Sequence, residues 1–313
     1  MNRLKAIFVI AILLVPCFLL YMFTIIFNQN TQVSVETQPP IVEEYVADDS
    51  AQKEETEQSI DESTEVQSTT ITEEIKEKVR EVIEGTINLF KKDLKIVAIG
   101  DSLTQGVGDE SEKGGYVGIL NHTFEDNNVN IKIENYGKRG NRTDQLLKRL
   151  ENKEISSSLK SADIILVTIG ANDIMQVVKN NFTNLNMDPF QQENHNYKER
   201  LTAIFTRISE LNPEAQIYLI GFYNPFEQYL ADIEEFGIII NNWNHTGQTV
   251  TEEFENVHFI PVADLFSDSD TNLLANDYFH PNTVGYKQIA RRVLDNMNEI
   301  SIDTEIRPED IEE

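Results

Sequence analysis

Short apolar runs recur along the last two thirds of the chain, and segments with helical spacing separate them. The runs are rich in Ile, Val and Leu, which is typical of strands buried on both faces of a parallel sheet. They lie at Lys95–Ile99, Asn130–Asn135, Asp163–Ile169, Gln216–Phe222 and Val257–Val262. The helix-like segments lie at Thr143–Leu150, Tyr197–Leu211, Leu230–Phe254 and Thr283–Met297. This alternation predicts a three-layer α/β/α domain over residues 95–300, built on a five-stranded parallel sheet.

A longer apolar run, Ala6–Phe27, precedes this domain. At 1.5 Å per residue, a helix over this run is about 33 Å long, which is enough to span a bilayer. Arg3 and Lys5 precede the run and no basic residue follows it closely, so the N-terminus should stay in the cytoplasm. We therefore expect a single-pass signal-anchor at residues 1–30 that holds the remaining chain to the cell membrane, on its extracytoplasmic side.

Two other fates of this segment stay open. A secretory signal could be cleaved, although its apolar region is usually shorter and no clear cleavage site follows Phe27. Lipoprotein processing could occur at Cys17, the single cysteine, although Pro16 stands where such sites ordinarily have a small residue. A lone cysteine also excludes an intramolecular disulfide.

The composition changes sharply between the apolar run and the domain. Residues 31–70 contain eleven Asp and Glu residues against a single Lys and few large apolar residues, which predicts a disordered spacer. Residues 71–94 include Glu73–Phe90, where apolar residues return at helical spacing and predict an amphipathic lead-in helix. Residues 301–313 form an acidic C-terminal tail.

The charge and the known short motifs exclude several functions. The formal net charge is −27, so nucleic acid is a poor partner, because a phosphate backbone needs clustered Lys and Arg. The chain has no Walker-type glycine loop, no CxxC and no HExxH. We expect no cofactor and no metal, since Asp101, Asp173, Asp277 and His280 do not form a tight ligand spacing.

Candidate chemistry lies in two segments that are far apart in the chain. Gly100–Gly106 follows the first strand-like run and places Ser102 on a turn. Asp277 stands three residues before His280, in a loop ahead of the last helix. Serine, histidine and aspartate together make an activated nucleophile, because histidine takes the serine proton and aspartate orients the histidine.

Two further segments follow strand-like runs and strengthen this interpretation. Gly137–Thr143 contains Gly140, and Gly170–Asp173 contains Asn172. In order, the four segments resemble the four blocks of the SGNH (GDSL) hydrolase family, and the resemblance covers about Lys95–Asn298. It implies a flavodoxin-like three-layer fold and hydrolysis of an ester through an acyl-enzyme.

The resemblance also implies a role for each matching residue. Ser102 would be the nucleophile, His280 the general base and Asp277 its orienting partner. The oxyanion hole would consist of the backbone N–H groups of Ser102 and Gly140 and the side-chain amide of Asn172. Donors aimed at the developing oxyanion agree with this chemistry, since one such donor is worth about 2.7–4 kcal/mol of barrier.

Other residues near these blocks have less specific interpretations. Asp101 and Asp173 should cap the segments that they begin, through local backbone hydrogen bonds. The four remaining histidines, which lack a carboxylate at short spacing, should be structural or solvated: His122, His195, His245 and His258. Two polar, aromatic-containing segments, Asn180–Tyr197 and Tyr223–Tyr229, follow the third and fourth strands and are candidate substrate-contacting loops.

These observations predict a membrane-anchored serine esterase or acylhydrolase that acts on a small-molecule, lipid or cell-envelope ester. A polysaccharide O-acetylesterase of the same fold remains open, as does a soluble secreted lipase. A binding module that holds an acylated ligand without turning it over is an alternative of another class. Retention of Ser102, Asn172, Asp277 and His280 argues against this alternative, because a binder does not need all four.

Overall fold

The structure is a computed structural model that describes residues 71–77, 94–111, 113–127, 131–181, 183, 186–227, 233–267 and 269–305, with side chains placed to residue 297 in the last range. Its centre is a sheet of five parallel strands in the order β2-β1-β3-β4-β5. The strands are β1 (Lys95–Gly100), β2 (Lys132–Gly137), β3 (Ile164–Thr168), β4 (Gln216–Ile220) and β5 (Val257–Ile260). The predicted fold class is confirmed.

The central strands are buried on both faces, as their sequences indicated. Every residue of β3 is buried, and β1 is buried from Ile96 onward. Strand β2 begins two residues later than predicted and is partly exposed, because it lies at the edge of the sheet. All strands are parallel, so their carboxyl ends meet at one edge, where ligands bind in such sheets.

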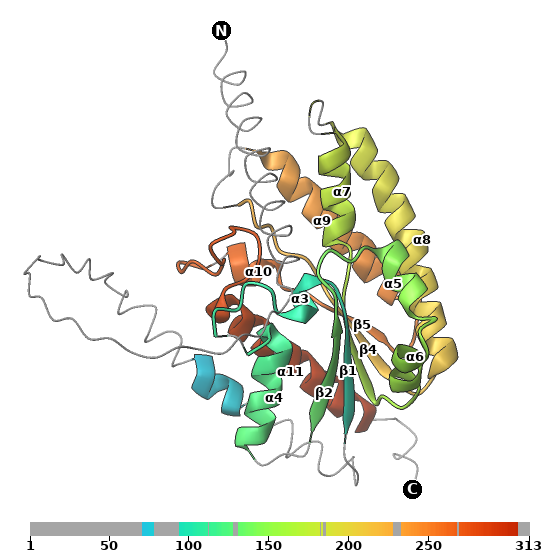
Figure 1. Cartoon of the computed structure of the whole chain (residues 1–313), viewed down its shortest axis with the longest axis vertical. Coiled ribbons are helices and arrows are strands. Elements are labelled where there is room, and N and C mark those ends of the chain that lie inside the picture. The colour runs from blue at the N-terminus through green and yellow to red at the C-terminus, as the bar shows by residue number, and fades with distance from the viewer. Residues whose placement is uncertain are drawn as a thin grey trace, which may run out of the picture. The chain divides into compact units, whose positions relative to one another are not determined.

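One face of the sheet is covered by α4 (Gly115–Asp126) and α11 (Thr283–Glu305), which pack against each other (Figure 1). Alternate strand residues such as Ile96, Ala98 and Leu166 share a core with Tyr116 of α4. The helix over residues 71–77 adds Ile71 and Ile75 to this core. The rest of the predicted lead-in helix lies outside the described residues.

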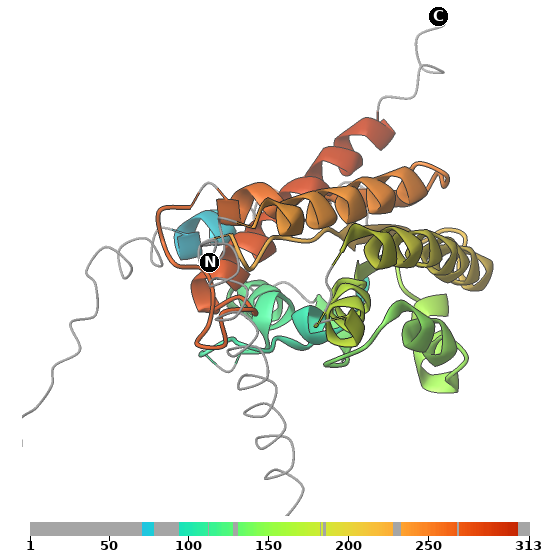
Figure 2. The ribbon, with the colours of Figure 1, turned by 90° about the horizontal axis from the view of Figure 1, so that it is seen from above.

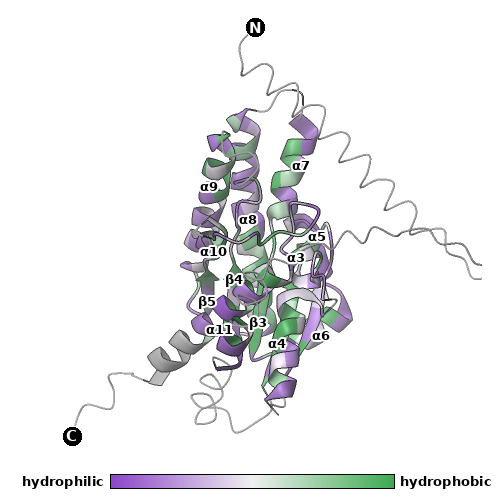
Figure 3. Cartoon of the chain, turned by 90° about the vertical axis from the view of Figure 1, so that its left-hand side faces the viewer, coloured by the Kyte–Doolittle hydropathy of each residue, from purple (hydrophilic) through white to green (hydrophobic). Residues whose placement is uncertain are grey.

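The other face carries α5 (Thr143–Arg149), α6 (Lys153–Lys160), α8 (Met187–Leu211) and α9 (Glu234–Thr251) (Figures 1 and 2). Helices α8 and α9 pack on each other, with Tyr197 stacked on Trp243 at 4.6 Å between ring centroids. Helix α7 (Ala171–Asn181) lies against α8. Figure 3 shows hydrophobic residues on the strands and on one side of the helices, and hydrophilic residues on the other.

The prediction that Asn180–Tyr197 forms a loop is wrong. Helix α8 begins at Met187, ten residues before the predicted start, and the side chain of Asn186 caps it by accepting from the backbone N–H of Asp188 at 3.2 Å. Of the amides that indicated a loop, Gln191 and Gln192 are exposed and Asn194 and Asn196 are half-buried on this helix, while Phe190 and Tyr197 are buried. Helices α6 and α10 (Ala263–Ser267) were not among the predicted helices.

The predicted signal-anchor and acidic spacer lie outside the described residues. Among the helices that the structure does describe, none combines the length and apolar character needed to cross a bilayer. Helix α11 continues to Glu305, into the segment predicted as the acidic tail.

Candidate active site

The carboxyl edge of the sheet carries the residues that the sequence singled out. Strand β1 leads into the short helix α3 (Ser102–Gln105), β2 into the loop with Gly140, and β3 into the start of α7 with Asn172. The loop before α11 brings His280 to Ser102 from the far end of the chain. Figure 1 shows α3 above the end of β1, at this edge.

Ser102 begins α3, and the turn that presents it is tightly enclosed. Asp101 caps the helix, since its carboxylate accepts from the backbone N–H of Leu103 at 3.0 Å. Gly100 has no room for a side chain, because a Cβ there would lie 2.1 Å from the carbonyl oxygen of Thr168. The turn therefore fixes the position of the serine hydroxyl at the end of a buried strand.

A continuous hydrogen-bonded relay joins the three predicted residues. His280 Nε2 lies 2.9 Å from Ser102 Oγ, and His280 Nδ1 lies 2.6 Å from Asp277 Oδ2. Burial alone would raise the pKa of Asp277, but hydrogen bonds from the ring and backbone of His280 and from the backbone of Phe279 outweigh it and lower the pKa. Asp277 thus remains an anion that accepts from Nδ1, which leaves Nε2 free to accept the serine proton.

The loop around this relay has an unusual backbone. Tyr278 has φ of +55°, the single non-glycine residue with positive φ among the described residues. The other oxygen of Asp277 accepts from the backbone N–H groups of Phe279 and His280 at 3.0 and 2.9 Å. Tyr223 donates its hydroxyl to the carbonyl of Phe279 at 2.7 Å, a support that the sequence did not indicate. The loop is therefore held on both sides of the histidine.

Gly140 and Asn172 lie on two segments that the structure ties together. The side-chain amide of Asn172 donates to the carbonyl of Asn141 at 3.0 Å, next to Gly140. Gly140 has φ of +75°, and a Cβ there would meet no atom within 4 Å, so the backbone faces open space. The side chain of Asn141 in turn accepts from Arg149 at 2.5 Å, and Arg149 is a second support that the sequence did not indicate.

Asp101 behaves as predicted, but it also makes a distant contact. Its carboxylate is 3% exposed and accepts from the hydroxyl of Thr168 at 3.0 Å as well as from the backbone of α3. Burial raises its pKa to about 6, against the effect of these hydrogen bonds. The hydroxyl of Thr168 in turn lies 2.7 Å from that of Thr104. Asp101 therefore links the end of β3 to the turn that carries Ser102.

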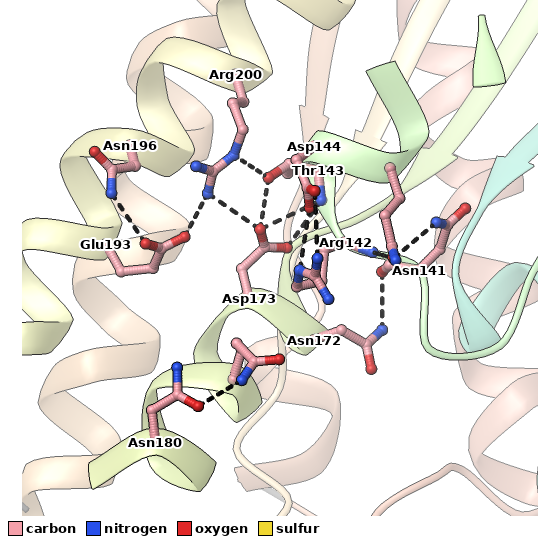
Figure 4. Close-up of polar contacts among 12 residues, drawn as sticks. Asn141, Arg142, Thr143, Asp144, Asn172, Asp173, Asn180, Glu193, Asn196 and Arg200 are labelled. Atoms are coloured by element: carbon pink, nitrogen blue, oxygen red, sulfur yellow. Dashed lines mark hydrogen bonds and ion pairs between the residues drawn. The ribbon is translucent and has the colours of Figure 1, made fainter. Parts of the chain in front are cut away.

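The expectation that Asp173 is a local cap is wrong. Its buried carboxylate accepts from the backbone N–H of Thr143 at 3.0 Å, from the hydroxyl of Thr143 at 2.6 Å and from Arg200 at 3.1 Å (Figure 4). Burial raises the pKa of Asp173, although the Thr143 hydrogen bonds and Arg200 oppose this shift. The partners come from α5 and α8, so their identity depends on the tertiary structure.

The other four histidines have structural or exposed positions, and three of them have partners other than Ser102. His122 is exposed on α4 and lies 2.8 Å from the carbonyl of Gly118. His195 is paired with Glu199 on the surface of α8, and His245 is exposed on α9. His258 lies 2.8 Å from Gln216 within the sheet, and burial lowers its pKa.

A largely apolar cavity opens beside Ser102. Its empty space, together with the solvent at its open mouth, amounts to about 610 Å³. The walls come from the segments after β3 and β4 and from α9, and Phe279 stands beside His280. The apolar wall residues include Ile169, Ile174, Met175, Ile220, Phe222, Phe226, Ile240 and Phe279. Of the two candidate substrate loops, Tyr223–Tyr229 contributes Tyr223, Pro225 and Phe226 to these walls, and the described residues of Asn180–Tyr197 contribute none.

The fold and the site define a carboxylic ester hydrolase of the α/β type, and comparison with known proteins agrees with that class. The family model described as GDSL-like Lipase/Acylhydrolase matches residues 98–288, and the chain belongs to this family. The match includes every residue of the serine, histidine and oxyanion blocks.

Three relatives illustrate the similarity. The chain is 37% identical over 207 residues to the uncharacterized protein YpmR of Bacillus subtilis, covering 65% of this chain and 81% of that protein. It is 25% identical over 209 residues to the spore germination lipase LipC of Bacillus licheniformis, and this match covers 64% of this chain and 94% of LipC. The crystal structure of the lipase Lip_vut3 from a goat rumen metagenome has the same fold, with a TM-score of 0.57 at 24% identity. The match covers 66% of this chain and 97% of Lip_vut3.

Proposed function

We propose that this protein cleaves carboxylic esters through an acyl-enzyme on Ser102. The observation that carries the proposal is the relay of 2.9 and 2.6 Å that joins Ser102, His280 and Asp277. A serine at the carboxyl edge of a parallel sheet, with a histidine in contact and a carboxylate behind it, has the parts that nucleophilic catalysis requires.

The geometry supports a reaction in two stages, formation of an acyl-enzyme and its hydrolysis. Ser102 Oγ attacks the ester carbonyl carbon while its proton passes to His280 Nε2. Asp277 stabilises the imidazolium that forms. The tetrahedral intermediate then collapses: the carbon–alkoxide bond breaks, and the proton on Nε2 goes to the leaving alcohol. Water then attacks the acyl carbon while its proton passes to His280 Nε2; the bond from that carbon to Ser102 Oγ breaks, Oγ takes the proton back from Nε2, and the acid leaves.

The oxyanion would be stabilised by the backbone N–H groups of Ser102 and Gly140 and by the amide of Asn172. Asn172 uses one of its two N–H bonds on the carbonyl of Asn141, and the second remains for the oxyanion. The open space in front of Gly140 leaves room for a substrate oxygen near its backbone. A neutral, pre-positioned set of donors stabilises negative charge with little reorganisation.

The cavity supports an aliphatic acyl group rather than acetyl alone. Its walls are almost entirely hydrocarbon or aromatic, and each methylene buried there gains about 0.8 kcal/mol. The relative named as a spore germination lipase is consistent with such a substrate. The alcohol side would be a small molecule, a lipid or a cell-envelope component.

The test is a hydrolysis screen with 4-nitrophenyl esters of two to sixteen carbons, run on the wild type and on Ser102→Ala. We expect the rate to rise from acetyl toward longer chains and to vanish in Ser102→Ala, and a fluorophosphonate probe to label only the wild type. Hydrolysis at near-wild-type rates by the folded Ser102→Ala variant would refute the nucleophile. Lack of both turnover and labelling in the wild type would favour a binding module.

We also propose that Ala6–Phe27 anchors the enzyme to the cell membrane, with the catalytic domain on the extracytoplasmic side. The span-length apolar run and the preceding Arg3 and Lys5 support this orientation. Fractionation and protease shaving of intact cells test it. Full-length protein in the culture medium would refute anchoring, and a protease-resistant domain in intact cells would refute the orientation.

A further inference from the structure

A partly buried ionic cluster joins the two segments that carry Asn172 and Gly140. The cluster consists of Asp173, Thr143, Arg200 and Glu193 (Figure 4). Asp173 directly follows Asn172, and Thr143 ends the loop that contains Gly140. The same carboxylate accepts the backbone N–H of Thr143 at 3.0 Å and its hydroxyl at 2.6 Å. One side chain therefore fixes the distance between the two segments.

Arg200 of α8 completes the cluster from outside both segments. Its Nε donates to the hydroxyl of Thr143 at 2.6 Å, and its Nη2 donates to Asp173 at 3.1 Å and to Glu193 at 2.5 Å. The hydroxyl of Thr143 accepts from Arg200, so its own proton points to Asp173. The planar guanidinium thus holds the hydroxyl and the carboxylate in one geometry, which a lysine cannot reproduce.

We propose that Asp173, Thr143 and Arg200 are positioning residues that set the relative placement of Asn172 and Gly140 for the oxyanion. This proposal rests on the function proposed above. Outside the cluster, the described part of the chain has one hydrogen bond between these two segments, which runs from the side-chain amide of Asn172 to the carbonyl of Asn141 at 3.0 Å. Without the cluster, that single bond must hold the two segments together.

The alternative is that the cluster only stabilises the fold. Asp173 is 1% exposed, and removal of one partner of a buried ion pair is strongly destabilising. A loss of activity alone cannot separate these roles. A kinetic coupling with Asn172 can, because global stability does not depend on which donor contacts the transition state.

The experiment is a double-mutant cycle between Arg200→Gln and Asn172→Ala, measured well below the melting temperature. We expect Arg200→Gln alone to lower kcat about tenfold or more with little change in KM, and Arg200→Lys to recover only part of it. In the Asn172→Ala background, Arg200→Gln should lower kcat less than threefold, since the donor that it positions is gone. The pair Thr143→Val and Thr143→Ser repeats the test with smaller changes, and the Ser variant should keep most activity.

The matched control is Arg207→Gln, which removes the same charge from the same helix. Arg207 pairs with Glu151 and Glu210 at the surface, so its loss should leave kcat within twofold. If Arg200→Gln and Asn172→Ala lower kcat additively, or if Thr143→Val keeps full kcat, the positioning role is refuted while the proposed function stands. If Asn172→Ala itself leaves kcat unchanged, the oxyanion assignment fails and this proposal fails with it.

Discussion

Replacing Asp101 by asparagine should stabilise the protein increasingly as the pH rises. Asp101 is buried, and burial raises its pKa from 3.8 to about 6. A carboxyl whose pKa is raised by folding stabilises the folded state below its unfolded pKa, and this contribution is lost as the pH rises through the folded pKa. The wild type therefore loses stability through this group between about pH 4 and pH 7, and the variant, which cannot ionise there, does not.

The magnitude follows from the two pKa values. The penalty for ionising Asp101 is roughly 1–2 kcal/mol at pH 5 and roughly 3 kcal/mol at pH 7.5. The stability of Asp101→Asn relative to the wild type should therefore rise by roughly 1–2 kcal/mol between these pH values. The change with pH is the quantity to compare, because any fixed cost of the new amide cancels. The asparagine carbonyl can still accept from Leu103 and Thr168, which share one oxygen of Asp101.

The assay is urea unfolding of a soluble fragment that contains the catalytic domain, at pH 5, 6 and 7.5. Asp109→Asn is the matched control. Hydrogen bonds from Ser111, Thr283 and Gly115 outweigh burial and lower the pKa of Asp109, so it is ionised in both folded and unfolded states throughout this range. Its difference from the wild type should be flat with pH. A difference that stays flat or falls with pH for Asp101→Asn would show that folding does not raise the pKa of the Asp101 carboxyl.

Three further predictions concern catalysis. Asn172→Ala should lower kcat about 10²–10³-fold with little change in KM, because an oxyanion donor acts mainly in the transition state. Steady-state kinetics test this prediction, and a rise in KM with kcat unchanged would contradict the assignment. Asp277→Asn should lower kcat about 10⁴-fold while the melting temperature changes little, because His280 loses the partner that sets its tautomer. A kcat within tenfold of the wild type would contradict the orienting role of Asp277. Met175→Trp should shift the preferred 4-nitrophenyl ester to a shorter chain by filling the cavity, whereas Met175→Leu, which conserves volume, should not; an unchanged chain-length profile in the Trp variant would place the acyl group elsewhere.

The sequence by itself was sufficient for the sheet and for the residues of the candidate site. Strands such as β3 are apolar at every position because both of their faces are covered, so they are visible as continuous runs. The blocks around Ser102, Asn172 and His280 are visible because, in their order along the chain, they resemble the blocks of the GDSL family. Parallel strands then imply that segments following their carboxyl ends lie at one edge of the sheet.

Only the tertiary structure decided the contacts between elements. The amide-rich start of α8 has the composition of a loop, and its helical state depends on the Asn186 cap and on the burial of Phe190 and Tyr197 against the rest of the domain. Asp173 has the sequence context of a local cap, yet its partners are Thr143 and Arg200, which are 30 and 27 residues away in the chain. The cavity has no sequence signature, because its walls come from several separate segments. Local sequence patterns indicate the interactions of a residue with its neighbours in the chain. Which buried polar groups form hydrogen bonds with each other depends on how helices that are distant in the sequence pack together.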